Sequence, residues 1–100
     1  MILRLSQKEL ETIKSTARSI FVEVGIYLFG SRVDDSKKGG DIDLYIVSSL
    51  HKDIFQKKRR LKVMLEDLLF KPVDIVLSRD PKSPIEKEAL KGVRILYKKE

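Results

Sequence analysis

Two short segments decide the fold of this chain: residues 27–31 read YLFGS, and residues 40–47 read GDIDLYIV. Both apolar runs have strand character, and the glycine and serine between them indicate a turn. Side chains two residues apart on a strand leave the same face, so Asp41 and Asp43 share one face and Ile42 leaves the other. The Cα atoms of the two acids are then about 6.6 to 7 Å apart. Like charges side by side on a sheet are destabilising, so this pair favours a divalent cation bound between its carboxylates.

Outward from these segments, the pattern alternates between helix and strand. Ser6 and Glu9 form a capping box that opens a helix, whose apolar stripe continues to Val24, and Gly25 is expected to end it. A second helix is predicted from Asp53 to Leu69, ending before Pro72. The other predicted elements are strands over 25–29, 41–47, 73–78 and 93–97, a turn and linker over 30–40, and a short helix over 85–90. The apolar stripe of the second helix comprises Ile54, Leu61, Leu65 and Leu68.

This alternation predicts an α+β fold with two layers: a mixed or antiparallel sheet of about four strands flanked by helices. A chain of 100 residues without repeats or a linker is expected to form one domain over residues 1–100. Its uncharged apolar stretches are far shorter than the roughly 20 residues that a membrane-spanning helix needs. We therefore expect no membrane association.

The composition limits which metals the chain can hold. It has no cysteine and one histidine, which excludes disulfides, thiolate sites and a histidine-rich zinc centre. Oxygen ligands remain, and they favour Mg²⁺ or Mn²⁺. The lack of cysteine and of a secretion signal also predicts a cytoplasmic protein.

A third acid completes the candidate site. Asp74 lies in the strand over 73–78, on the face opposite Val73, and shares the face of Asp41 and Asp43 if the two strands are neighbours. Three converging carboxylates can bind two divalent ions about 3.5 to 4 Å apart, an arrangement suited to in-line displacement at phosphorus. Upstream, Gly30 lets the backbone approach a phosphate, and Ser31 can donate hydrogen bonds to it. Arg32 is suited to pairing with a phosphate oxygen.

These residues carry a resemblance. The chain is similar to the nucleotidyltransferase superfamily typified by DNA polymerase beta in three segments. These are Phe29-Gly30-Ser31, then after nine residues Asp41-Ile42-Asp43-Leu44, and later Val73-Asp74-Ile75-Val76. More narrowly, the chain resembles the minimal nucleotidyltransferases, which are antitoxins of toxins with a HEPN domain.

The resemblance implies a role for each of these residues. Asp41, Asp43 and Asp74 are the implied catalytic residues and metal ligands, and Gly30, Ser31 and Arg32 the implied nucleotide-binding residues. The implied reaction uses Mg²⁺ and ATP, or another nucleoside triphosphate. It transfers a nucleoside monophosphate to a tyrosine hydroxyl of the HEPN toxin.

Two other functions are compatible with the sequence. The chain could neutralise its partner by docking alone, although a binding module has no need of three acids placed together. Direct binding to nucleic acid is supported only by the net charge of +6. The basic run 57–60 adds little support for nucleic-acid binding, because four consecutive helical residues point around most of the helix circumference and do not form one basic face.

Overall fold

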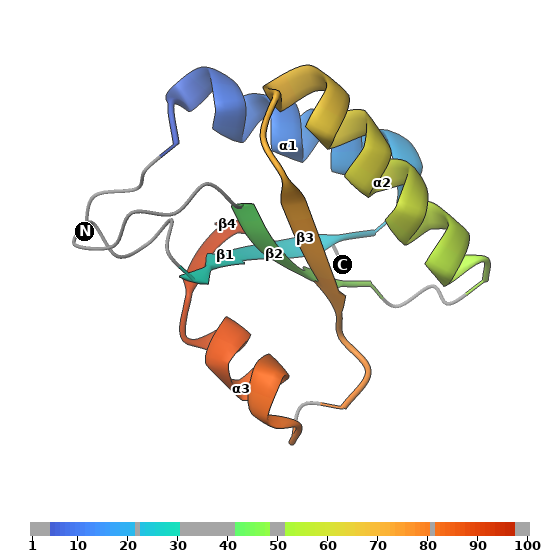
Figure 1. Ribbon diagram of the computed structural model, residues 1–100. Coiled ribbons are helices and arrows are strands. Elements are labelled where there is room, and N and C mark those ends of the chain that lie inside the picture. The colour runs from blue at the N-terminus through green and yellow to red at the C-terminus, as the bar shows by residue number, and fades with distance from the viewer. Residues whose placement is uncertain (1–4, 22, 31–41, 49–51, 81, 98–100) are drawn as a thin grey trace.

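The computed structural model describes residues 5–21, 23–30, 42–48, 52–80 and 82–97 (Figure 1). Three helices and four strands lie in this part of the chain: α1 (Gln7–Ile20), β1 (Gly25–Phe29), β2 (Ile42–Val47), α2 (Ile54–Leu69), β3 (Val73–Leu77), α3 (Pro84–Leu90) and β4 (Val93–Leu96). The strands form one sheet in the order β3-β2-β1-β4. β1 is antiparallel to both β2 and β4, and β2 is parallel to β3. The predicted α+β fold with a mixed sheet of four strands is therefore confirmed.

The helices are divided between the two faces of the sheet. α1 and α2 lie together on one face, and α3 covers part of the other (Figure 1). The parallel pairing of β2 and β3 follows from α2, since a helix between two strands lets the second strand run in the direction of the first. None of the helices in the described ranges is both long and apolar enough to cross a membrane.

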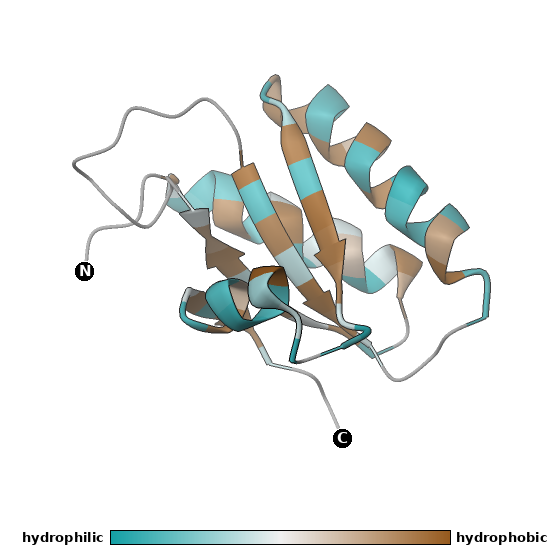
Figure 2. Cartoon of the chain, turned by 60° about the horizontal axis from the view of Figure 1, so that its bottom comes forward, coloured by the Kyte–Doolittle hydropathy of each residue, from teal (hydrophilic) through white to brown (hydrophobic). Residues whose placement is uncertain are grey.

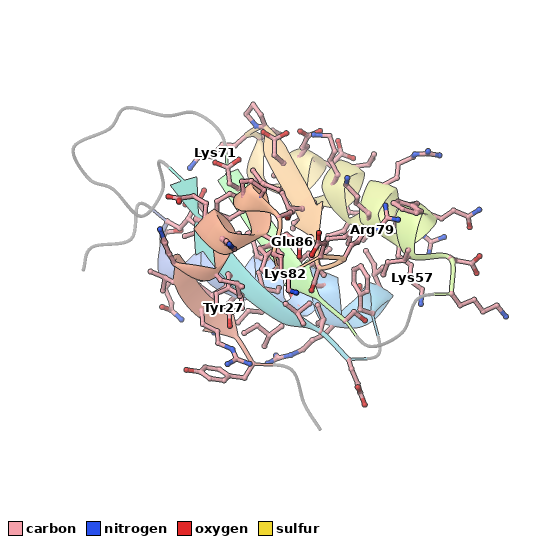
Figure 3. The ribbon with its side chains drawn as sticks, turned by 90° about the horizontal axis from the view of Figure 1, so that it is seen from below. Tyr27, Lys57, Lys71, Arg79, Lys82 and Glu86 are labelled. Carbon is pink, nitrogen blue, oxygen red and sulfur yellow. The ribbon has the colours of Figure 1, made fainter. Side chains whose placement is uncertain are left out.

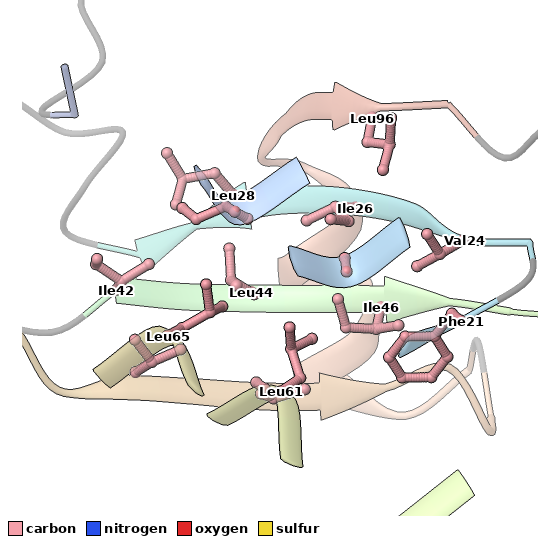
Figure 4. Packing of buried hydrophobic residues seen from close by; sticks show 14 of the residues in the cluster. Phe21, Val24, Ile26, Leu28, Ile42, Leu44, Ile46, Leu61, Leu65 and Leu96 are labelled. Carbon is pink, nitrogen blue, oxygen red and sulfur yellow. The ribbon is translucent and has the colours of Figure 1, made fainter. Parts of the chain in front are cut away.

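The main core lies between the sheet and the pair α1–α2 (Figure 4). Every second residue of a strand points into this core, and the alternating hydropathy of β2 and β3 is visible in Figure 2. The fully buried members include Ile13 from α1, Leu61 and Leu65 from α2, and Ile26, Leu28, Ile42, Leu44 and Val73 from the strands. The acids of β2 and β3 are consequently directed to the opposite face, on which α3 packs.

The beginning of α1 agrees with its predicted capping box, but its end does not lie where the sequence suggested. The Ser6 hydroxyl accepts from the Glu9 N–H at 3.1 Å, and the Glu9 carboxylate accepts from the Ser6 N–H at 3.0 Å. The prediction that Gly25 ends this helix is wrong: Phe21 is its C-cap, with extended backbone (φ −106°, ψ 139°), and Gly25 begins β1. The extended backbone lets Phe21 and Val24 both reach the core, where they are 2% and 4% exposed.

One member of the predicted α2 stripe is also misplaced. Leu61 and Leu65 are buried as expected, but Leu68 is 54% exposed and Leu69 takes its place at 9%. The last turn of α2 therefore presents a large apolar side chain to solvent. The C-cap residue that follows, Phe70, is 90% exposed.

Candidate functional site

The candidate site lies where three strands meet at one end of the sheet. β1 ends there and β2 begins there, because the two strands are antiparallel and Phe29 is the register partner of Asp43. β3 begins at the same end, because it is parallel to β2 and Asp74 is the other register partner of Asp43. Residues that are 31 positions apart in the sequence thus face each other across one strand pair.

Asp43 and Asp74 lie side by side on one face of the sheet. Register partners on adjacent strands have their Cα atoms about 4.8 Å apart, and their side chains leave the same face. The flanking residues Ile42 and Val73 are both fully buried in the core beneath, so the two carboxylates point to the α3 side. Asp43 is half-buried and Asp74 is exposed, which leaves the pair accessible to a ligand. The structure therefore brings together two of the three predicted acids.

Gly30 lies directly against the Asp43 carboxylate. It has a positive φ of +78°, and a Cβ atom built on it would overlap Asp43 Oδ2 and lie 3.2 Å from Asp43 Cγ. Any other residue at position 30 would have to adopt a strained backbone and displace the carboxylate. The predicted reason for this glycine was close approach of the backbone to a phosphate. The structure adds a second reason, which is that the glycine leaves room for an acid of the site.

Three predicted site residues, Ser31, Arg32 and Asp41, lie outside the described residues. Within the described ranges, no three histidine, cysteine, aspartate or glutamate side chains come close enough to form a metal site. Asp43 and Asp74 supply two carboxylates, and hard oxygen donors of this kind fit Mg²⁺ or Mn²⁺. The chemistry of the described donors thus agrees with the predicted metal class.

α3 forms the boundary of the open part of this face. Tyr45 follows Asp43 on the same face of β2 but is only 1% exposed, because it packs with Phe29 of β1 and Ala89 of α3. The ring of Tyr27 lies beside that of Tyr45, with 5.8 Å between the centroids. The half of the face beyond Asp43 is therefore closed by packing, and the half at the strand ends is open.

A buried glutamate that the sequence analysis did not identify holds α3 in this place. Glu86 is 4% exposed and accepts a hydrogen bond from the Tyr45 hydroxyl at 2.8 Å. It also accepts from the backbone N–H groups of Arg79 and Asp80, at 3.1 and 2.7 Å. Figure 3 shows Glu86 on the α3 side of the sheet. In the sequence, Tyr45 could have pointed to such a buried acceptor, because its hydroxyl needs a hydrogen-bond partner once the ring is buried on this face.

These contacts set the charge of the buried pair. Burial by itself would raise the pKa of Glu86, but the hydrogen bonds from the Asp80 N–H, the Tyr45 hydroxyl and the Arg79 N–H outweigh it and hold the pKa below its usual value. Burial raises the pKa of Tyr45, and its bond to the Glu86 carboxylate adds to that rise. At neutral pH the network is therefore an ionised carboxylate held by three donors.

A separate cavity of 190 Å³ lies at the opposite ends of β2 and β3. Its lining includes Ser48, Phe55, Ser78 and Arg79, and the guanidinium of Arg79 lies over the Phe55 ring at 5.1 Å. Asp43 and Asp74 do not border it. We place the candidate site at the acids and not at this cavity, because the acids are two carboxylates that lie side by side as register partners.

Comparison with known proteins identifies a family and a structurally similar chain. The family described as polymerase beta, nucleotidyltransferase matches residues 11–100. No curated protein matches in sequence. A chain in the rebuilt and re-refined structure of tri-AMPylated Shewanella oneidensis HEPN toxin in complex with MNT antitoxin is similar in structure, with a TM-score of 0.70 and 21% identity. The match covers 91% of the present chain and 71% of the other.

Proposed function

Because the chain belongs to the polymerase beta nucleotidyltransferase family, we propose that it transfers a nucleoside monophosphate, AMP from ATP, to a hydroxyl of a partner protein. The observation that carries this proposal is the register pairing of Asp43 with Asp74 beside Gly30. In this proposal the chain is a single nucleotidyltransferase domain over residues 1–100, and the reaction depends on Mg²⁺.

Each acid has a distinct task in the proposed reaction. Asp41 and Asp43 bind the cation that accompanies the triphosphate. Asp74, on the neighbouring strand, faces the incoming hydroxyl and accepts its proton. Mg²⁺, when bound, neutralises the charge that develops on the phosphate oxygens and orients the attack. The hydroxyl oxygen bonds to the α-phosphorus while the bond from that phosphorus to the bridging oxygen breaks, so pyrophosphate leaves.

The glycine turn holds the rest of the nucleotide in this scheme. Gly30 directly follows β1 and lies beside Asp43, so a triphosphate bound by the Gly30 and Ser31 backbone lies next to the cation. Arg32 pairs with a phosphate oxygen. The supporting observation is that Gly30 is exposed and carries the positive φ that opens the backbone at this point.

The acceptor is proposed to belong to another protein. α3 and its buried Glu86 close the face beyond Asp43, and the open half of the face at the strand ends is accessible from outside. The structurally similar chain comes from a complex between an AMPylated HEPN toxin and its MNT antitoxin. We therefore propose a HEPN toxin as the partner and one of its tyrosines as the acceptor.

Label transfer tests the proposal. The purified chain is incubated with ATP labelled on the α-phosphate, Mg²⁺ and a HEPN-domain protein from the same organism, and labelled partner is quantified. We expect label on the partner that is lost in Asp43→Asn and in Asp74→Asn, with both variants folded. A matched control is Asp67→Asn, an exposed acid on α2 that should leave transfer unchanged.

The same variants, assayed for toxin neutralisation in cells, examine the alternative function. If the chain neutralises its partner by docking alone, Asp43→Asn and Asp74→Asn will neutralise the toxin in cells as well as the wild type does. Loss of neutralisation in both variants, with complex formation intact, supports transfer instead.

A further inference from the structure

The C-cap residue of α2 has a backbone that its side chain disfavours. Phe70 has φ 57° and ψ 36°, in the left-handed region. Helices commonly end with a residue in this conformation, but it is usually glycine, because a side chain there crowds the following carbonyl. A bulky aromatic residue at such a position is uncommon. On grounds of stability alone, glycine or asparagine would be expected at this position.

The Phe70 side chain gives the fold little in return. It is 90% exposed, so almost none of its ring is removed from water. Leu68, two residues earlier, is 54% exposed. Met64, one helical turn before Leu68 on the same side of α2, is 38% exposed. The end of α2 thus presents apolar side chains that are only partly buried or, for Phe70, almost fully exposed.

The turn that carries Phe70 is nevertheless held in place on both sides. The Phe70 N–H donates to the Glu66 carbonyl at 3.0 Å, and the Pro72 carbonyl accepts from the Ile42 N–H at 2.9 Å. Between them, the Lys71 ammonium pairs with the Glu9 carboxylate of α1 at 2.7 Å. Figure 3 shows Lys71 at the end of the molecule where β3 begins. The exposed ring therefore projects from a fixed backbone, which suits a docking contact.

This turn adjoins the acid pair. Asp74 is four residues after Phe70, so the two Cα atoms are at most about 14 Å apart. Because β3 is an edge strand, a partner that places a hydroxyl at Asp74 can also reach the Phe70 turn around this edge of the sheet. Aromatic side chains that become buried in a partner commonly contribute most of the binding energy of an interface.

We propose that Phe70, with Leu68, is the contact by which the chain docks its acceptor protein. This inference rests on the proposed function, because it takes the acceptor to be the HEPN-domain protein. It also explains why an aromatic residue is kept in a conformation that glycine would occupy with less strain. Docking at Phe70 would hold the acceptor hydroxyl near Asp74 before transfer.

The variant Phe70→Gly separates docking from folding, because its two expected effects have opposite signs. Relief of the backbone strain should raise the Tm by about 4 °C or more. Affinity for the purified HEPN-domain protein, measured without nucleotide by titration calorimetry, should fall about tenfold or more. In the transfer assay the KM for that protein should rise, while kcat stays near the wild-type value.

Phe55→Ala is the matched control. Phe55 is an exposed phenylalanine near the first residue of α2, about 22 Å along the helix from Phe70. Its removal should leave the affinity for the HEPN-domain protein unchanged.

Several outcomes would overturn the inference. A lower Tm for Phe70→Gly would mean that the ring supports the fold, and an unchanged affinity would mean that it does not dock the acceptor. Failure of the wild type to bind the HEPN-domain protein, or self-association of the wild type that Phe70→Gly abolishes, would also overturn it. Affinity that depends on Phe70 without any label transfer would uphold docking and refute the transferase function.

Discussion

Replacement of Gly30 by alanine should damage the site more than the fold. The added methyl group has two effects that the structure separates. The positive φ of +78° costs about 1 to 2 kcal/mol of stability for a residue with a side chain. In addition, the Cβ atom would overlap Asp43 Oδ2, so the Asp43 carboxylate must rotate away from the position it shares with Asp74. Displacing a reacting group or ligand by about 1 Å can reduce a rate about 100-fold.

Chemical denaturation and label transfer measure these two effects. We expect Gly30→Ala to lose more unfolding free energy than the about 1 to 2 kcal/mol that the strained backbone accounts for, because the overlap with Asp43 adds to it. The transfer rate should fall at least about 100-fold. Gly92→Ala is the control, because its Cβ would overlap the Leu28 carbonyl oxygen and lie 2.8 Å from Phe29 Cβ, and neither atom belongs to an acid. It should destabilise the protein while the folded fraction keeps its transfer rate.

A double-mutant cycle with Asp43→Ala identifies the cause. If Gly30→Ala acts by displacing the Asp43 carboxylate, the methyl group added at position 30 meets no carboxylate in the Asp43→Ala background. Only the backbone strain of about 1 to 2 kcal/mol then remains. Transfer by Gly30→Ala at more than half the wild-type rate would refute the reasoning. So would additive stability losses whose sum leaves no coupling between the two positions.

Three further predictions concern charge. Mg²⁺ at millimolar concentration should raise the Tm of the wild type and not that of Asp74→Asn, because the cation relieves the repulsion between the paired acids; differential scanning fluorimetry measures both. Glu86→Gln should lose about 2 to 3 kcal/mol at pH 7, because a buried carboxylate held by three donors becomes an amide. The Glu86 pKa is lowered in the folded state, so its contribution is complete above the ordinary value of 4.5 and is lost as the pH falls below it; the deficit of Glu86→Gln in urea titrations should shrink in that range. Lys71→Met should cost no more than about 1 kcal/mol in the same titrations, because the ion pair with Glu9 is only partly buried.

The sequence predicted much of the fold because its strongest signals are local. Alternation along residues 41–47 and 73–78 placed an acid of each strand on the face opposite the core. That inference needs only the period of a strand. The capping box at Ser6 was equally local, and the structure contains it.

The predictions were wrong where contacts with other elements, and not the local sequence, determine which side chains are buried. Leu68 and Leu69 are both leucines at the end of an amphipathic helix, so periodicity alone could not show which one faces the core. Glu86 has the sequence context of an exposed acid in the first turn of a helix. Its burial depends on Tyr45, which lies 41 residues earlier and is brought to it by the packing of α3 on the sheet. The direct pairing of Asp43 with Asp74 likewise depends on how α2 returns the chain to β3.

Three residues that serve the fold poorly lie at or near the start of β3: Asp43, Asp74 and Phe70. Asp43 and Asp74 place like charges on adjacent strands, an arrangement that costs roughly 0.2 to 1 kcal/mol. Phe70, which leads into β3, combines a left-handed backbone with a ring that is 90% exposed. A sequence selected for stability alone would replace each of them, and such local conflicts are expected at functional sites. A cation between the acids would relieve their repulsion, and a partner over the ring would remove its apolar surface from water. The same stretch from Phe70 to Asp74 would then recognise the acceptor protein and accept the proton of its hydroxyl.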